Sequence, residues 1–390
     1  MITWETVRLG NISSIKGGKR LPAGTSLIKN VNSHPYIRVR DLNNVSTIEI
    51  TNEFEYVDDQ TYKKIARYTV SEGDIILSIV GTIGLVVVVG ETLDKANLTE
   101  NCVKITKLAE EYNKKFIFYY LCSPRGQNEI RKGIVGAVQA KLPLKNISAI
   151  EIPMMPIDKQ ERIAKVLSSI DDKIELNTKI NHNLEEQAKA LFKSWFIDFE
   201  PFKDGEFVDS ELGKIPVEWS IGTLKDMLEV RYGKDHKKLA DGIVPVYGSG
   251  GLMRYAEKSI YNGESILIPR KGTLNNVMRV TGEFWTVDTM FYSVPRKVGA
   301  AKYLYYILSD INLAAMNSGS AVPSMTTDIL NAIKVVIPSD EILMEFEREA
   351  SFFWDIIEMN NLEKQKLSQL RDSLLPKLMS GEIDVSEVEV

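Results

Sequence analysis

The sequence contains the same order of segments twice: a stretch of short apolar runs and then a long amphipathic run. In the first long run, apolar and small residues recur in three- and four-residue steps from Val166 to Trp195, without Pro or Gly. The second long run begins near Asp340 and carries a similar stripe from Phe346 to Leu378. This period is typical of a helix that presents a seam to another helix. Two long helices that pair with each other are therefore expected.

The two long runs are copies of each other. When residues 168–177 are laid over 351–360, similar residues coincide, and the register continues downstream. The matched pairs are Asp172 with Asp355, Ile174 with Ile357, Glu175 with Glu358, Asn177 with Asn360, Leu184 with Leu367 and Leu191 with Leu374. A helix from Asp158 to Phe196 would be roughly 60 Å long, which suits a spacer. Pro376 and Gly381 are expected to mark the end of the second helix.

The blocks that precede the helices also repeat, with register shifts of a few residues between matches. The matches are Trp4 with Trp219, Gly73–Ile83 with Gly263–Leu274, Lys115–Leu121 with Lys302–Leu308, Gly136–Val138 with Ser320–Val322, and Ile152–Pro153 with Ile337–Pro338. Within each block, short Val, Ile and Tyr runs alternate with Gly and Asn turns, and one helix interrupts them (Lys114–Cys122, Ala301–Ser309). This pattern predicts an α+β fold without alternating βαβ units.

At 390 residues the chain is long enough for two or three domains. The repeat predicts a globular domain at 1–155, a helix at 156–197, a linker at 198–211, a second globular domain at 212–338 and a helix at 339–380. The linker is rich in Pro, Gly and acidic residues, and we expect it to be ordered.

Several classes of protein are disfavoured by composition. Cys102 and Cys122 are the only cysteines and the three histidines lie far apart, so disulfide scaffolds and structural zinc sites are not expected. The uncharged stretch Ile75–Gly90 is too short for a membrane span, and glycines break it into two apolar runs, which predicts two buried strands around a turn. Charged residues near the N-terminus argue against an export signal, so a cytoplasmic protein is expected.

The net charge of −5 hides an uneven distribution. Residues 1–155 carry 20 Lys and Arg against 16 Asp and Glu, and residues 212–338 carry 15 against 11. Residues 156–211 carry 8 against 13, and residues 339–390 carry 5 against 13. The domains are thus mildly basic and the helical segments acidic, which favours a polyanion as partner of the domains and proteins as partners of the helices.

Cations and hydroxyls stand beside glycine in several loops of the basic blocks. Glycine lets a backbone approach closely, Lys and Arg neutralise phosphates, and Arg reads base edges through paired hydrogen bonds. Each loop alone is more typical of a solvent-exposed turn, but recurrence in both copies favours a DNA-binding surface. The candidate DNA-binding residues are Lys16, Lys19, Arg20, Arg38, Arg40, Arg231, Lys234, Lys237, Lys238, Ser249, Arg270 and Lys271.

Signatures of catalysis are missing from the sequence. It contains no Pro-Pro, hence no Asn- or Asp-Pro-Pro-aromatic tetrapeptide of a DNA methyltransferase, and Gly17–Arg20 lacks the spacing of a P-loop. Asp171 and Asp172 are the most visible acidic pair, but adjacent residues of a helix point apart, which favours a solvated face over a metal site. Asn177 and Asn181 in the helix seam are expected to fix its register.

The chain resembles the specificity subunit of type I restriction–modification enzymes from end to end. Three stretches carry the resemblance: Ala190–Phe202, Glu211–Pro216 with Trp219, and Leu370–Glu382. The resemblance implies two target recognition domains, each reading one half of a split, asymmetric DNA site, held apart by an antiparallel coiled coil of the two helices. It also implies a turn with a basic or polar pair, which the second copy keeps as Arg270–Lys271 and the first replaces by Ser78–Val80.

The resemblance further implies partners. Two methylation subunits would dock on this chain, and motor-nuclease (restriction) subunits could join them. S-adenosylmethionine, ATP and magnesium would be bound by those subunits, and this chain would hold no cofactor or metal and have no activity of its own. Two other functions stay open from the residues alone: an assembly protein whose domains bind protein, and a self-sufficient methyltransferase or nuclease, which the missing motifs disfavour.

Overall fold

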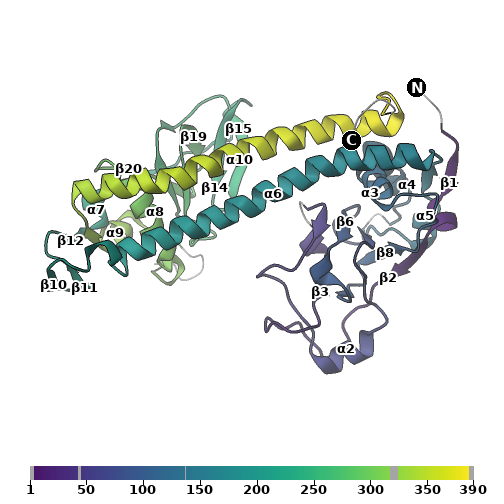
Figure 1. Ribbon diagram of the computed structural model, residues 1–390, viewed down its shortest axis with the longest axis horizontal. Helices are drawn as coiled ribbons and strands as arrows, with labels where there is room; N and C mark the ends of the chain where they lie inside the picture. The colour runs from purple at the N-terminus through teal and green to yellow at the C-terminus, as the bar shows by residue number, and fades with distance from the viewer. Residues whose placement is uncertain (1–3, 43–44, 137, 317–323, 386–390) are drawn as a thin grey trace. The chain divides into compact units, whose positions relative to one another are not determined.

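The computed structural model describes residues 4–42, 45–136, 138–316 and 324–385. It divides into two compact units, which we call unit 1 (Met1–Asn177 with Leu362–Val390) and unit 2 (Thr178–Asn361). In Figure 1 the globular part of unit 1 runs from purple to blue and that of unit 2 is green. The match between Gly136–Val138 and Ser320–Val322 includes residues outside the described ranges.

Unit 1 is built on a five-stranded sheet with the order β2-β8-β5-β6-β4. Strands β5 and β6 pair antiparallel, with Ile75 opposite Val88, so the uncharged stretch forms a buried hairpin as predicted. The elements are β1 Thr6–Arg8, α1 Leu9–Ile12, β2 Ser14–Gly17, β3 Tyr36–Ile37, η1 Val39–Leu42, β4 Thr47–Ile48, α2 Asp59–Ile65, β5 Ile75–Ser78, β6 Val86–Val89, η2 Glu91–Leu93, β7 Asn97–Leu98, β8 Cys102–Thr106, α3 Lys114–Cys122, α4 Pro124–Lys132, α5 Leu144–Ser148, β9 Glu151–Pro153 and the first part of α6 Ile157–Phe196.

Unit 2 contains two four-stranded sheets, with the orders β13-β20-β17-β18 and β15-β14-β19-β16. Its elements after α6 are η3 Glu200–Phe202, β10 Phe207–Ser210, β11 Gly213–Pro216, β12 Ser220–Thr223, α7 Leu224–Met227, β13 Leu228–Tyr232, β14 Val244–Gly248, β15 Gly251–Ala256, β16 Tyr261–Asn262, β17 Ser265–Pro269, β18 Met278–Val280, β19 Glu283–Thr286, β20 Met290–Pro295, α8 Ala300–Asp310, η4 Leu313–Met316, α9 Thr327–Asn331, β21 Lys334–Ile337 and the first part of α10 Asp340–Ser380.

The two domains repeat one architecture. The strand order β2-β8-β5-β6 of unit 1 matches β13-β20-β17-β18 of unit 2, and the antiparallel pair β1-β9 matches β12-β21. Helix α3 follows the sheet of unit 1 where α8 follows that of unit 2. The predicted fold class is therefore confirmed: two similar α+β domains, with two long helices that pair antiparallel within each unit.

Both long helices contribute apolar side chains to the core of each unit. Neither helix is therefore a spacer that stands apart from the domains. In unit 1, Leu167 of α6 and Leu378 of α10 are buried in one apolar cluster with α3. In unit 2, Phe196 of α6 and Phe346 of α10 are buried with α8, their rings 4.9 Å apart. Apolar faces of helices are stable only when they are covered in this way.

Helix α10 runs through Pro376 and ends at Ser380, directly before Gly381, in agreement with the predicted helix at 339–380. Proline removes one intrahelical hydrogen bond, but buried Leu375 and Leu378 on either side of it hold the last turns against unit 1. The residue that follows the helix, Gly381, has a φ of 73° and thus takes the left-handed conformation that glycine tolerates. The next residue, Glu382, donates its N–H to the Lys377 carbonyl at 3.0 Å.

Polar residues in the helix seam are paired with each other. Asn181 and Asn360 are linked at 2.8 Å in unit 2, and Asn177 donates to Glu363 at 2.6 Å in unit 1. Asp171 does not lie on a solvated face as the sequence suggested, because its side chain is buried and paired with Arg371. Helix α10 supplies the cation from the opposite side of the seam, which the sequence of α6 alone could not reveal.

The linker between α6 and the second domain is ordered. Phe199 and Phe202 pack on Trp219 with ring centroids 5.7 and 5.1 Å apart, and the β10-β11 hairpin follows. These contacts attach the segment to the core of unit 2.

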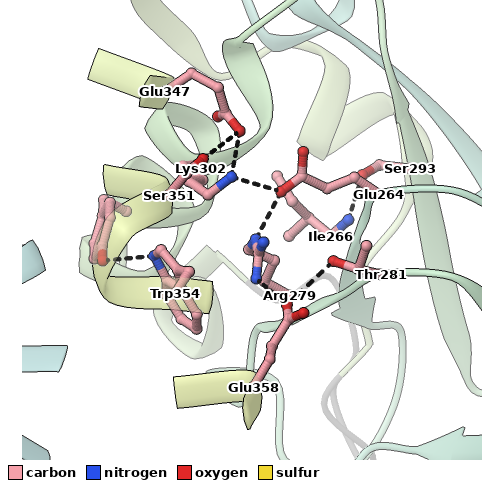
Figure 2. Close-up of polar contacts among 11 residues, drawn as sticks. Glu264, Ile266, Arg279, Thr281, Ser293, Lys302, Glu347, Ser351, Trp354 and Glu358 are labelled. Carbon is pink, nitrogen blue, oxygen red and sulfur yellow. Dashed lines mark hydrogen bonds and ion pairs between the residues drawn. The ribbon is translucent and has the colours of Figure 1, made fainter. Parts of the chain in front are cut away.

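Buried charges join the second domain to α10, as Figure 2 shows. Lys302 of α8 is paired with Glu347 of α10 and with Glu264, whose carboxylate also accepts from Arg279 at 2.7 Å. Arg279 contacts Glu358 of α10 at 3.1 Å. The Lys302 and Arg279 side chains are only 4% and 5% exposed. This network links the second domain to α10 through ion pairs.

Candidate nucleic-acid interface

In unit 1, a glycine at the end of β2 brings a basic loop against the sheet. Gly18 donates its N–H to the Cys102 carbonyl at 3.0 Å, and Lys19 donates to the Leu98 carbonyl at 2.8 Å. A Cβ on Gly18 would lie 2.0 Å from the Thr99 carbonyl oxygen, so only glycine permits this approach. The loop therefore has a fixed backbone from which Lys19 projects.

Unit 2 repeats this arrangement bond for bond. Gly233 donates to the Met290 carbonyl at 3.0 Å, and Lys234 donates to the Thr286 carbonyl at 2.9 Å. A Cβ on Gly233 would lie 2.1 Å from the Val287 carbonyl oxygen. The Gly-Lys pairs of the two domains thus occupy the same structural position.

A third chain segment completes the frame in both units. In unit 1 the Ile79 N–H donates to the Asn101 carbonyl at 2.8 Å, and in unit 2 the Arg270 N–H donates to the Thr289 carbonyl at 2.9 Å. We call this set of matching backbone hydrogen bonds the sheet-end frame. At this position of the frame the second domain has Arg270, whereas the first domain has the apolar residue Ile79.

Further cations lie near the basic loop of unit 1. Lys16 of β2 lies opposite Lys104 of β8 in the sheet, and both line a hollow of about 270 Å³ together with Arg67. The Lys19 ammonium lies 5.6 Å from the ring centroid of Tyr68, which lines the same hollow. Lys16 and Lys19 are exposed and thus available to an anion.

The other three candidates of unit 1 carry internal partners. Arg20 contacts Glu100 at 2.6 Å, although its side chain is 81% exposed. Arg38 and Arg40 both face Glu55, and Arg40 also contacts Asp41 at 3.4 Å. Burial raises the pKa of Asp41 to about 6, while Arg40 opposes this shift. A phosphate that bound Arg38 or Arg40 would have to compete with these carboxylates.

In unit 2, four candidates lie in β13 and in the loop that follows it. Arg231 donates two hydrogen bonds to Glu229, at 2.8 and 2.9 Å, and this interaction raises its pKa. The side chains of Lys234, Lys237 and Lys238 are exposed. The structure thus presents three lysines on one loop, with Arg231 held back by its neighbour.

The remaining candidates of unit 2 lie on adjoining loops. The Arg270 guanidinium lies 5.4 Å from the ring centroid of Tyr232 and donates to the Asp288 carbonyl at 3.2 Å. Ser249 approaches Gly272 so closely that a Cβ there would lie 2.7 Å from the serine Oγ. Lys271, between Arg270 and Gly272, is exposed. Ser249, Arg270 and Lys271 are therefore brought together.

Other polar residues near the candidate interface were not predicted from the sequence, because the prediction selected cations beside glycine, and one of them, Lys104, is paired with buried Asp74 at 3.4 Å. Arg67 and Lys104 of unit 1 have no glycine neighbour, although the apolar–polar alternation of Cys102–Thr106 marks Lys104 as the side chain that leaves the core. In unit 2, Asn276 donates to the Ser249 carbonyl at 2.8 Å and so fixes that loop. No pattern in the sequence marks Asn276.

The described ranges hold no group of three or more His, Cys, Asp or Glu side chains arranged to bind a metal ion. In the same part of the chain, no helix combines the length and apolar character needed to cross a membrane.

Two similar α+β domains, matching sheet-end frames and two helices shared between the units define a duplicated scaffold. The sequence matches the family described as type I restriction modification DNA specificity domain over residues 1–186 and 216–372. The chain belongs to this family and is a specificity subunit of a type I restriction–modification system.

Curated relatives agree over nearly the whole length. The MjaIX specificity subunit of Methanocaldococcus jannaschii is 28% identical over 417 residues, a match that covers 99% of this chain and 94% of the relative. The HindI specificity subunit of Haemophilus influenzae is 23% identical and covers 98% and 100%. A solved S subunit from M. genitalium has a TM-score of 0.58 at 17% identity and covers 97% and 96%, which supports the same fold.

Proposed function

We propose that each domain reads one half of a bipartite, asymmetric DNA target. One observation carries this proposal: the sheet-end frame is the same in both units, but the side chains that it presents differ. Lys19 and Lys234 stand at the same position of the two frames, but the first unit has Ile79 where the second has Arg270. A common backbone supports a common way of approaching DNA, and different side chains let the two half-sites differ.

The two helices would set the distance between the half-sites and dock the methylation subunits. Two copies of one partner fit a duplicated chain, because each copy would meet the same architecture. We place S-adenosylmethionine on the methylation subunits, and ATP and magnesium on restriction subunits that can join them. This chain would then bind double-stranded DNA and its protein partners without catalysing a reaction itself.

The test is an exchange of residues 1–155 for the same region of another family member, in cells that supply the methylation subunits. Methylome sequencing then gives the modified sequence. We expect one half of that sequence to change and the other to stay the same. An unchanged sequence would favour a pure assembly protein, and methylation by the purified chain alone would contradict the non-catalytic role.

A further inference from the structure

The turn that lacks a basic pair in unit 1 has a lysine beside it on another segment. Val80 forms an antiparallel bridge with Lys141. The bridge is held by the next residue, Leu142, whose N–H donates to the Ile79 carbonyl at 3.0 Å. Lys141 is exposed, and so is Val80, at 37%.

Unit 2 contains the same bridge with the lysine on the other of the two segments. There Lys271 forms an antiparallel bridge with Ser324, and Met325 donates its N–H to the Arg270 carbonyl at 2.9 Å. The small polar residue now stands on the second segment and the cation on the first.

Residues that face each other across an antiparallel bridge project their side chains from the same face. The pair Val80 and Lys141 therefore offers one ammonium group at the place where the pair Lys271 and Ser324 offers one. The lysine of unit 1 stands on the neighbouring segment of the bridge, a few ångströms from the position of Lys271 in unit 2. A flexible four-carbon lysine side chain can span this difference. Sequence comparison along one segment misses this exchange, because it aligns Val80 with Lys271 only.

We propose that Lys141 binds a backbone phosphate of the DNA half-site read by unit 1, as the counterpart of Lys271 in unit 2. This inference rests on the proposed function. A phosphate suits the ammonium group, which is a point charge, better than a base edge, which requires paired hydrogen bonds. Because phosphates are the same for every sequence, Lys141 adds affinity and leaves the recognised sequence unchanged.

The experiment measures DNA binding by the chain assembled with its methylation subunits, on a duplex that carries the methylated site. Dissociation constants are determined over a series of salt concentrations for the wild type, Lys141→Gln and the control Lys115→Gln. Lys115 is an exposed lysine of α3, away from the sheet-end frame. We expect Lys141→Gln to make the dependence of the dissociation constant on salt less steep. The slope of log Kd against log salt should fall by about 0.9, which corresponds to the loss of one phosphate contact. The control keeps the wild-type slope, and neither variant changes the methylated sequence.

A second variant separates charge from folding. Val80→Lys combined with Lys141→Ser rebuilds in unit 1 the bridge of unit 2, and we expect it to regain the wild-type slope. Any of three results would overturn the inference: an unchanged slope for Lys141→Gln, a changed half-site, or a double variant that does not regain the wild-type slope. Absence of specific binding by the wild-type complex would instead overturn the proposed function.

Discussion

Arg371 of α10 donates to Asp171 of α6 at 2.8 Å, and the carboxylate is 8% exposed. The second oxygen of Asp171 accepts a hydrogen bond from Tyr119 of α3 at 2.7 Å. One carboxylate thus joins both long helices to the first domain. At the equivalent position of unit 2, Trp354 donates to Tyr306 of α8 at 3.1 Å. At matching positions, unit 1 joins three helices through a buried carboxylate, whereas unit 2 joins α8 and α10 through a hydrogen bond between two aromatic side chains.

Replacing Arg371 by Met should destabilise unit 1, because it leaves the buried Asp171 charge with a single neutral partner. Arg371 is 29% exposed, so we expect a loss of about 2 kcal/mol, below the range for fully buried pairs. Denaturant unfolding of the full chain measures this loss. The control is Arg348→Met, which removes a cation that is 71% exposed and should cost under about 0.5 kcal/mol. Equal effects of the two variants would contradict the prediction.

Lys302→Met should destabilise unit 2 more strongly. The lysine is 4% exposed and lies between Glu264 and Glu347, so its loss leaves two carboxylates near each other (Figure 2). We expect a cost of about 3 kcal/mol in denaturant unfolding, since a buried charge loses its partner. Adding Glu347→Leu should recover a large part of it. The variant Lys297→Met, whose partner Asp340 is 69% exposed, serves as control and should cost little.

The helices were predictable from the sequence, and their partners were not. The steps of three and four residues placed α6 within two residues of its observed ends, and α10 ends at Ser380, next to the predicted stop at Gly381. Asp171 and Lys302 are polar residues whose burial depends on residues far away in the sequence. Local periodicity records which face of a helix is apolar. It contains no information on a cation 200 residues downstream that makes a buried carboxylate acceptable.

Both cysteines should react slowly with thiol reagents in the folded chain. Burial raises the pKa of Cys102 and of Cys122 to about 12, from an ordinary value of 9.0. A raised pKa lowers the fraction of thiolate, the reactive form, so at pH 8 it falls roughly a thousandfold. Labelling with iodoacetamide, followed by mass spectrometry, should show slow modification at pH 8 that accelerates as the pH rises toward 10. Rapid labelling of either residue in the folded chain, at the rate seen in denaturant, would contradict this.

The residues of the candidate interface were also predictable only in part. Cations beside glycine predicted the loops of the sheet-end frame, because close backbone approach requires glycine at Gly18 and Gly233. The sequence could not show that Arg38 faces Glu55, since the two residues lie on different loops. Lys141 was not among the predicted residues for a different reason. It lies far from the turn in sequence and reaches it only through a single bridge.

Lengthening both helices by one heptad should widen the gap between the half-sites. The paired residues Asp171 with Arg371 and Asn177 with Glu363 place Ile174 of α6 near Leu367 of α10, so the insertions belong after these two positions. Seven residues preserve the seam, whereas the four of a single helical turn would disturb its register. They add about 10 Å of helix, or about three base pairs at 3.4 Å each. Methylome sequencing should report the same two half-sites with a longer gap. The control is the same insertion in the β10-β11 turn after Leu212, outside both helices, which should leave the gap unchanged. If the gap stays constant when both helices are lengthened, the helices do not set the spacing, and the half-site distance must be fixed by the partner subunits.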